Sequence, residues 1–161
     1  MKHATLCFVV DRSTNRVLLG RKKRGFGAGK LNGFGGKIDR GETAVDAVVR
    51  EVREECGLVL STEGLVHLGA IRFDFPWNRS FDHDVRVFLT TAWTGVPQET
   101  EEMSPFWASC AAPPFEQMWA DDRYWLPIAL SMTQFTARFS FAQDNETVAT
   151  WWMQLTPDDG C

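Results

Sequence analysis

The chain has 161 residues and a formal net charge of −4, from 17 basic and 21 acidic side chains. That length favours one domain over residues 1–161, and the acidic balance argues against a nucleic acid polymer as partner. With 44% hydrophobic and 12% aromatic residues the chain is not disordered, and no apolar run approaches the roughly 20 residues that cross a membrane.

The N-terminal part predicts a β-hairpin and then a glycine-rich loop. Residues 5–10 and 16–20 have strand character, and residues 11–15 between them are typical of a turn. The loop over residues 22–36 holds six glycines, and its basic side chains give it a charge opposite to that of the whole chain: Lys22, Lys23, Arg24 and Lys30.

The clearest predicted helix covers residues 43–55. Four valines at 45, 48, 49 and 52 form one apolar stripe at helical spacing. Because valine is a weak helix former, packing must hold this helix, and Gly57 provides its stop.

The rest of the chain predicts more strands than helices. Strands are expected over 65–75 and 84–91 around a turn at 76–80, over a short stretch at 106–108, and over 135–141 and 147–155. Residues 114–122 predict an irregular or short helical piece, and 124–132 a second helix with Pro127 near its first turn. We expect the Trp151-Trp152 pair to belong to a packed closing strand.

The face of the first helix opposite the valines carries Glu51, Glu54 and Glu55. Residues three and four apart are neighbours on a helix, so these carboxylates repel one another. Mg²⁺ takes carboxylates together with substrate phosphates, and a cationic glycine-rich loop precedes the helix. Arg50 can pair with Glu54 and orient it, so the pattern indicates a metal–polyphosphate site.

These residues resemble the Nudix family. The pattern Gly36-x5-Glu42-x7-Arg50-Glu51-Val52-x-Glu54-Glu55-x-Gly57-Leu58 matches every fixed position of the Nudix box, here 36–58. The resemblance implies the Nudix fold, an α/β (α+β) domain whose mixed β-sheet core lies between helices, with a loop–helix–loop catalytic motif. It also implies hydrolysis of a nucleoside diphosphate derivative with Mg²⁺, for which Mn²⁺ is a substitute.

The resemblance implies roles for individual residues. Glu55 is the first candidate for the general base and Glu102 the second, with Glu54 and Arg50 also in the catalytic set. The implied metal ligands are the Gly35 carbonyl and the carboxylates of Glu51, Glu54, Glu55 and Glu102. Water would attack a phosphorus, giving a nucleoside monophosphate and pyrophosphate.

Flanking segments resemble the animal branch of the family that hydrolyses oxidised purine nucleoside triphosphates such as 8-oxo-dGTP and 2-hydroxy-dATP. They are 16–20, 22–37, 73–75, 102–103 and 118–125. The expected partner is therefore a small nucleoside triphosphate. The implied substrate-binding residues are Cys7, Lys22, Phe26, Asn32, Phe34, Gly35, Gly36, Lys37, Phe73, Trp119, Asp121 and Asp122.

The chemistry of these residues suits a purine. Trp119 with Phe26 or Phe73 offers a stacking surface, and Asn32 offers both a donor and an acceptor. Two adjacent carboxyl groups in a poorly solvated pocket do not both ionise readily, so Asp121 and Asp122 together would present a donor and an acceptor.

Simpler interpretations compete with this one. Trp119 and Phe73 could be core, the Asp121-Asp122 pair an exposed turn or a helix N-cap, and Asn32 a turn residue. Another Nudix hydrolase, acting on dinucleoside polyphosphates, ADP-ribose, NADH or capped RNA, and a catalytically silent binding module are the alternative functions.

The chain departs from the branch's pattern near the pocket. Leu31 replaces a Trp, Cys7 a Thr, Ala120 a Pro, and loop 76–81 is longer. His83 replaces a pocket Met, and we expect it on the surface of its hairpin without a role.

The cysteines Cys7, Cys56, Cys110 and Cys161 are far apart and lack CxxC spacing, which favours free thiols in a reducing compartment. No secretory signal is evident. We expect a cytoplasmic monomer, with the nucleus and mitochondrion as further compartments.

Overall fold

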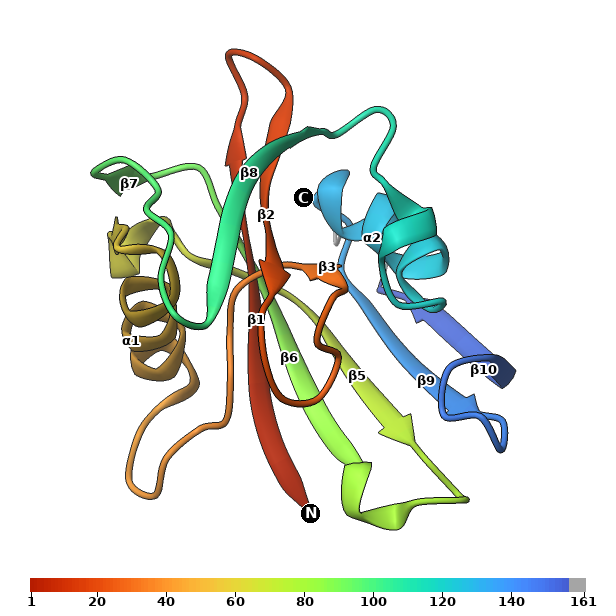
Figure 1. Ribbon diagram of the computed structural model, residues 1–161. Helices are drawn as coiled ribbons and strands as arrows, with labels where there is room; N and C mark the ends of the chain where they lie inside the picture. The colour runs from red at the N-terminus through yellow and green to blue at the C-terminus, as the bar shows by residue number, and fades with distance from the viewer. Residues whose placement is uncertain (157–161) are drawn as a thin grey trace.

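The structure, a computed structural model, describes residues 1–156 and shows a mixed sheet with one helix on each face (Figure 1). The helices are α1 (Ala44–Cys56) and α2 (Asp122–Leu130). The eight strands of the sheet are β1 (Lys2–Asp11), β2 (Arg16–Lys22), β3 (Leu31–Asn32), β5 (Val66–Asp74), β6 (His83–Thr90), β8 (Met103–Ser109), β9 (Phe135–Phe141) and β10 (Val148–Leu155). The predicted α/β (α+β) class is confirmed.

The strands follow the order β10-β9-β5-β6-β1-β2-β3, and β8 pairs with the other edge of β2. A second sheet holds β4 (Val59–Leu60) and β7 (Trp93–Thr94), and three short 3-10 turns are η1 (Thr62–Gly64), η2 (Arg79–Phe81) and η3 (Phe115–Gln117). The two-residue strands were not predicted because their segments are too short for a period to be read.

The central strand β1 divides the interior into two hydrophobic cores. Side chains alternate between the two faces of a strand. Phe8 and Val10 therefore join the core that includes Trp125 of α2, whereas Cys7 and Val9 join the core that includes Val48 and Val52 of α1.

Helix α1 lies one residue later at each end than the predicted 43–55. Thr43 is the N-cap, and its hydroxyl accepts a hydrogen bond of 3.1 Å from the Asp46 N–H. Gly57 has φ of 78° and donates its N–H to the Arg53 carbonyl at 2.9 Å. The valine stripe packs against the sheet, which supplies the stability that valine's helix propensity lacks.

Strand β8 and helix α2 differ from their predicted bounds. Strand β8 runs from Met103 and includes Pro105, which the prediction excluded. This strand pairs with β2 alone, so the missing N–H of Pro105 costs no ladder bond. Helix α2 begins at Asp122, two residues before the predicted start, and contains Pro127.

The C-terminal hairpin closes the sheet. Strand β10 forms one end of the sheet, paired to β9, and Trp151 and Trp152 are 46% and 49% exposed. Trp151 packs on Tyr124 at 4.7 Å between ring centroids, so the closing strand is only partly covered.

The cysteines that the structure describes, Cys7, Cys56 and Cys110, are free thiols, and Cys161 lies outside the described residues. Over residues 1–156 the helices are too short and too polar to span a membrane.

Candidate active site

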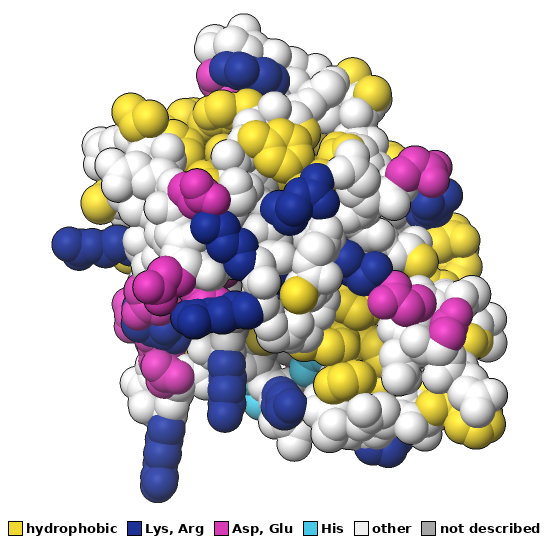
Figure 2. Space-filling view, viewed as in Figure 1, with side chains coloured by type: hydrophobic (Ala, Val, Ile, Leu, Met, Phe, Trp, Pro, Cys, Tyr) yellow, Lys and Arg dark blue, Asp and Glu magenta, His cyan; other side chains and the backbone are white. Residues whose placement is uncertain are grey.

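A cavity of about 160 Å³ opens between the glycine-rich loop, the first half of β1 and the two helices. Figure 2 shows hydrophobic side chains and a histidine in a hollow rimmed by Lys and Arg, with acidic side chains gathered over α1. One end faces α1 and is lined by Lys22, Gly35, Gly36 and Glu55; the other faces α2 and is lined by Asn32, Trp119, Asp121 and Asp122.

The backbone of residues 34–38 lies along β1 as an irregular extra strand. The Thr5 N–H donates to the Gly36 carbonyl at 2.9 Å, and the Cys7 N–H donates to the Phe34 carbonyl at 2.6 Å. A Cβ at Gly35 would lie 2.0 Å from the Thr5 carbonyl oxygen, and one at Gly36 would lie 2.5 Å from Glu51 Oε1. The close approach of the β1 backbone therefore requires glycine at Gly35, whereas a side chain at Gly36 would displace the carboxylate of Glu51.

Glu55 is the carboxylate of α1 that faces the cavity. It is 9% exposed, and its Oε1 accepts the Gly35 N–H at 2.8 Å. Burial raises the pKa of Glu55 to about 8; the charges of Glu51 and Glu102 add to this shift, and the Gly35 N–H and Lys22 oppose it. Glu55 can therefore hold a proton near neutral pH, unlike an exposed glutamate.

Arg50 organises the remaining acids of this helix. Its Nε donates to Glu42 Oε2 at 2.8 Å and its Nη1 to Glu51 Oε1 at 2.9 Å. Glu54 is more exposed, and its Oε2 is 3.4 Å from Nη1. The predicted pair between Arg50 and Glu54 is present, and Glu42 braces the same guanidinium.

The predicted metal ligands do not converge. Within residues 1–156 no three acidic, His or Cys side chains are placed to hold an ion together. Each carboxylate is instead paired within the protein. Glu51 and Glu54 share the Arg50 guanidinium, Glu55 accepts the Gly35 N–H, and Glu102 accepts from Arg24 Nε at 2.8 Å. Like charges repel, so carboxylates without a cation between them do not come together.

The donor set nevertheless fits a hard divalent cation. All the groups are oxygens, and three of the carboxylates come from adjacent turns of α1. Part of the rise in the pKa of Glu55 comes from the charges of Glu51 and Glu102, which is the crowding that a divalent cation would offset.

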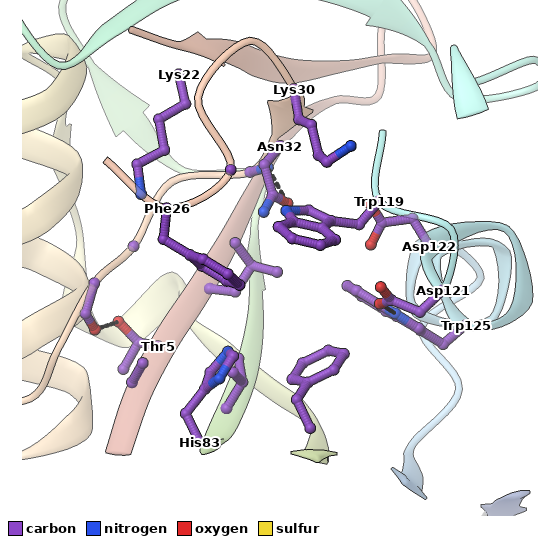
Figure 3. A pocket seen from close by; sticks show the side chains of 18 of the residues that line it. Thr5, Lys22, Phe26, Lys30, Asn32, His83, Trp119, Asp121, Asp122 and Trp125 are labelled. Atoms are coloured by element: carbon purple, nitrogen blue, oxygen red, sulfur yellow. Dashed lines mark hydrogen bonds between the residues drawn. The ribbon is translucent and has the colours of Figure 1, made fainter. Parts of the chain in front are cut away.

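The α2 end of the cavity is aromatic (Figure 3). Trp119 lies 5.0 Å from Phe26 and 6.4 Å from Phe75 between ring centroids, and Phe73 also lines the cavity. Asn32 Oδ1 accepts the Gly33 N–H at 2.8 Å, which leaves the amide NH₂ for a ligand. Trp119 thus borders the cavity and is not simply core, and Asn32 faces it as well.

Asp121 and Asp122 are each 2% exposed. Asp121 Oδ2 accepts a hydrogen bond of 2.7 Å from Trp125 Nε1, whereas Asp122 Oδ2 is buried without a partner among the described residues. Burial raises the pKa of both, and the charge of Asp121 raises that of Asp122 further. Asp121 stands at the N-cap position of α2, as one interpretation predicted, but its side chain makes no cap hydrogen bond; the exposed-turn interpretation is wrong, because both side chains are buried.

Three of the predicted substrate-binding residues do not line the cavity. Cys7 and Phe34 are fully buried in the core beneath α1, because strand alternation directs them to the face opposite Leu6 and Phe8. The Lys37 side chain is exposed, and its carbonyl accepts from Arg50 Nη2 at 3.1 Å. Only the backbone of these residues supports the site.

His83 was expected on the surface, and the structure corrects this. Its ring stacks on Phe73 at 5.1 Å in the wall of the cavity, and Nδ1 lies 2.6 Å from the Phe81 carbonyl, to which it donates. Burial lowers the pKa of His83, so the ring is neutral near pH 7. Alternation along β6 could have shown that His83 shares a face with Val85.

Further lining residues were missed by sequence reasoning. Among them are Lys30, Phe75, Trp125 and Phe141, together with Thr5, Leu6, Val85 and Met103. Trp125 follows Asp121 by one helical turn, a spacing that places both on one face. Of the departures, Leu31 is fully buried against Met118, so it packs beneath the site.

Comparisons with known proteins agree with this geometry. The NUDIX domain description matches residues 1–129. The chain is 45% identical to the oxidized purine nucleoside triphosphate hydrolase of Mus musculus over 136 residues, covering 84% of this chain and 85% of that protein. It is 46% identical to the protein of the same name from Danio rerio over 140 residues, covering 87% and 86%.

A solved structure shares the fold. A MutT protein from Bacillus halodurans superposes with a TM-score of 0.81 at 23% identity, covering 95% of this chain and 97% of that chain. At this identity the likeness concerns the fold alone.

Proposed function

The chain belongs to the Nudix family and is a Nudix hydrolase, and from this we propose that it hydrolyses oxidised purine nucleoside triphosphates. Substrates of the 8-oxo-dGTP and 2-hydroxy-dATP type would give the nucleoside monophosphate and pyrophosphate. The observation that best supports this substrate class is the buried Asp121–Asp122 pair beside Trp119, at the opposite end of the cavity from Glu55. The names of the mouse and zebrafish relatives support the same substrate class.

Recognition of the base follows from the α2 end. Trp119 provides a stacking face, worth about 1–3 kcal/mol per base. The aspartate pair, holding one proton between its two carboxyl groups, offers one donor and one acceptor, and the Asn32 amide offers another donor. Moving the shared proton from one aspartate to the other would exchange donor and acceptor, which suits both an oxidised guanine and an oxidised adenine.

Nudix hydrolases use a divalent metal, and we propose Mg²⁺, with Mn²⁺ as a substitute. Glu51, Glu54 and Glu55 would hold it, together with the Gly35 carbonyl and Glu102. When bound, the ion neutralises phosphate oxygens and makes water more acidic.

The chain's own groups supply the rest of the reaction. Lys22 at the mouth of the α1 end binds phosphate oxygens. In its ionised form Glu55 takes the proton from the attacking water: it faces the cavity, and a carboxylate whose pKa is raised is the stronger base once ionised. The Arg24 guanidinium lowers the pKa of Glu102, which argues against Glu102 in that role.

Pyrophosphate release tests the proposal, with Mg²⁺ and with EDTA, on 8-oxo-dGTP, 2-hydroxy-dATP, O6-methyl-dGTP, dGTP and ADP-ribose. A strong Mg²⁺-dependent preference for an oxidised purine triphosphate over dGTP is expected. A flat profile would refute the substrate class, turnover of ADP-ribose alone would favour another Nudix activity, and no turnover would favour a silent binding module.

We propose a monomer as the active form. Light scattering at the assay concentration checks this, and a dimer with monomers that lack activity would contradict it.

A further inference from the structure

Glu146 of the C-terminal hairpin contacts the aromatic end of the cavity indirectly, through an ion pair with Lys30. Glu146 lies in the turn between β9 and β10, beyond the residues that the family description matches. Its Oε2 is 2.7 Å from Lys30 Nζ, and that ammonium lies 4.9 Å from the centroid of the Trp119 ring. Three distant segments therefore meet at the residue proposed to stack on the base.

The turn that carries Glu146 is held in place by its own hydrogen bonds. Asp144 Oδ1 accepts the N–H groups of Glu146 at 2.9 Å and Thr147 at 2.8 Å, and Asp144 Oδ2 accepts the Thr147 hydroxyl at 2.6 Å. These bonds fix the backbone of Glu146, and they keep its side chain close to Lys30.

The backbone of Lys30 is also fixed, but its side chain depends on the ion pair. The Lys30 N–H donates to the Gly27 carbonyl, and the Lys30 carbonyl accepts the Lys22 N–H, both at 3.0 Å. A lysine side chain is a long flexible stem with a strongly hydrated head, so without a partner it prefers bulk water. The carboxylate of Glu146 holds that head over the indole instead.

Lys30 acts on two parts of the base-binding end. In Figure 3 Lys30 and Phe26 lie on opposite sides of the Trp119 ring: the ammonium is 4.9 Å from its centroid and the Phe26 centroid 5.0 Å, while Trp119 still lines the cavity. A cation at this distance from an indole is attracted to its π face and restrains the ring. The same charge opposes the rise in the pKa of Asp122 caused by burial and by Asp121.

We propose that Glu146 is a positioning residue for purine recognition: it holds Lys30 over Trp119, and so raises the affinity for the base without touching the substrate. The inference rests on the proposed function, because it assigns the base to Trp119.

Steady-state kinetics with 8-oxo-dGTP tests this in Glu146→Gln, Lys30→Met and the double variant. Glu146→Gln should raise KM about 2- to 5-fold, as expected for loss of a part-exposed ion pair. Lys30→Met should raise KM about 3- to 30-fold through the lost cation–π contact. In Glu146→Gln the kcat should stay unchanged, because Glu146 does not line the cavity and Glu55 lies at its other end.

The double variant gives the sharpest result. If Glu146 acts only through Lys30, Glu146→Gln adds nothing to KM in the Lys30→Met background. Lys30→Arg should keep a KM near that of the wild type, since a guanidinium also stacks on indole. Glu63→Gln, an exposed acid on η1, is the matched control and should leave KM unchanged.

A charge swap distinguishes the effect of the cation over Trp119 on KM from the effect of the ion pair itself. Lys30→Glu with Glu146→Lys can restore the pair but places a carboxylate beside Trp119, so KM should stay high. Recovery of the wild-type KM would overturn the inference, as would an unchanged KM in Glu146→Gln. A wild-type protein that does not hydrolyse 8-oxo-dGTP overturns the proposed function and this inference with it, whereas the other results leave the proposed function intact.

Discussion

Replacing Asp122 with Asn should remove a pH dependence from the stability of the protein. Asp122 is 2% exposed, and burial beside Asp121 raises its pKa well above that of a free aspartate. The folded protein therefore keeps a proton that the unfolded chain releases. The free energy of unfolding of the wild type then falls as pH rises from the unfolded pKa, about 3.9, through the folded-state pKa.

The size of the effect follows from the single retained proton. One proton bound in the folded state and not in the unfolded state costs about 1.4 kcal/mol of stability per pH unit. For each pH unit between the unfolded-state and the folded-state pKa, the wild type should therefore lose about 1.4 kcal/mol relative to Asp122→Asn, whose amide does not titrate. Below the unfolded pKa both states are protonated and this contribution is fully present.

Urea unfolding at pH 5, 6, 7 and 8 measures the difference between variant and wild type. The difference should grow with pH in favour of Asp122→Asn. Asp144→Asn is the control: hydrogen bonds from Thr147 and Glu146 lower the pKa of Asp144 to about 2, so this group is ionised in both states across the range and its difference should be flat. A flat difference for Asp122→Asn would refute the buried, protonated pair.

The remaining predictions concern the α1 end. Glu55→Gln keeps an acceptor for the Gly35 N–H, so the circular dichroism spectrum should be unchanged while kcat falls about 10²- to 10⁴-fold; near-normal turnover would remove Glu55 from the role of base. Gly35→Ala places a Cβ 2.0 Å from the Thr5 carbonyl oxygen and should cost about 1–3 kcal/mol in urea unfolding, and an unchanged midpoint would contradict this close approach. Arg50→Lys should fold but turn over slowly, because an ammonium cannot bind Glu42 through two parallel hydrogen bonds as the guanidinium does; wild-type kcat in this variant would show that the brace is dispensable.

Sequence predicted best what depends on neighbouring residues. The valine stripe and the stop at Gly57 define α1 to within one residue, because both are short-range signals. The fixed spacing from Gly36 to Leu58 identified the family for the same reason. Strands β1, β2 and β9 were also predicted to within a few residues from alternation and turn chemistry.

Sequence could not predict which side chains face the cavity, since that depends on how distant segments pair. Phe34 and Cys7 were assigned to the substrate, but the bridge between them turns both side chains into the core beneath α1. His83 was placed on the surface, but the packing of β5 beside β6 puts it against Phe73. The contact of Glu146 with Lys30 has no local signal at all.

The acidic face of α1 shows why the site needs its tertiary surroundings. Glu51, Glu54 and Glu55 at neighbouring helical positions repel and would destabilise an isolated helix. In the folded protein Arg50 compensates two of these charges, and the Gly35 N–H, held against β1, compensates the third. The pKa of Glu55 still rises to about 8, so the compensation is incomplete. Helix stability alone would favour fewer acidic residues on α1. The presence of all three is explained by the proposed role of their carboxylates in the phosphate chemistry.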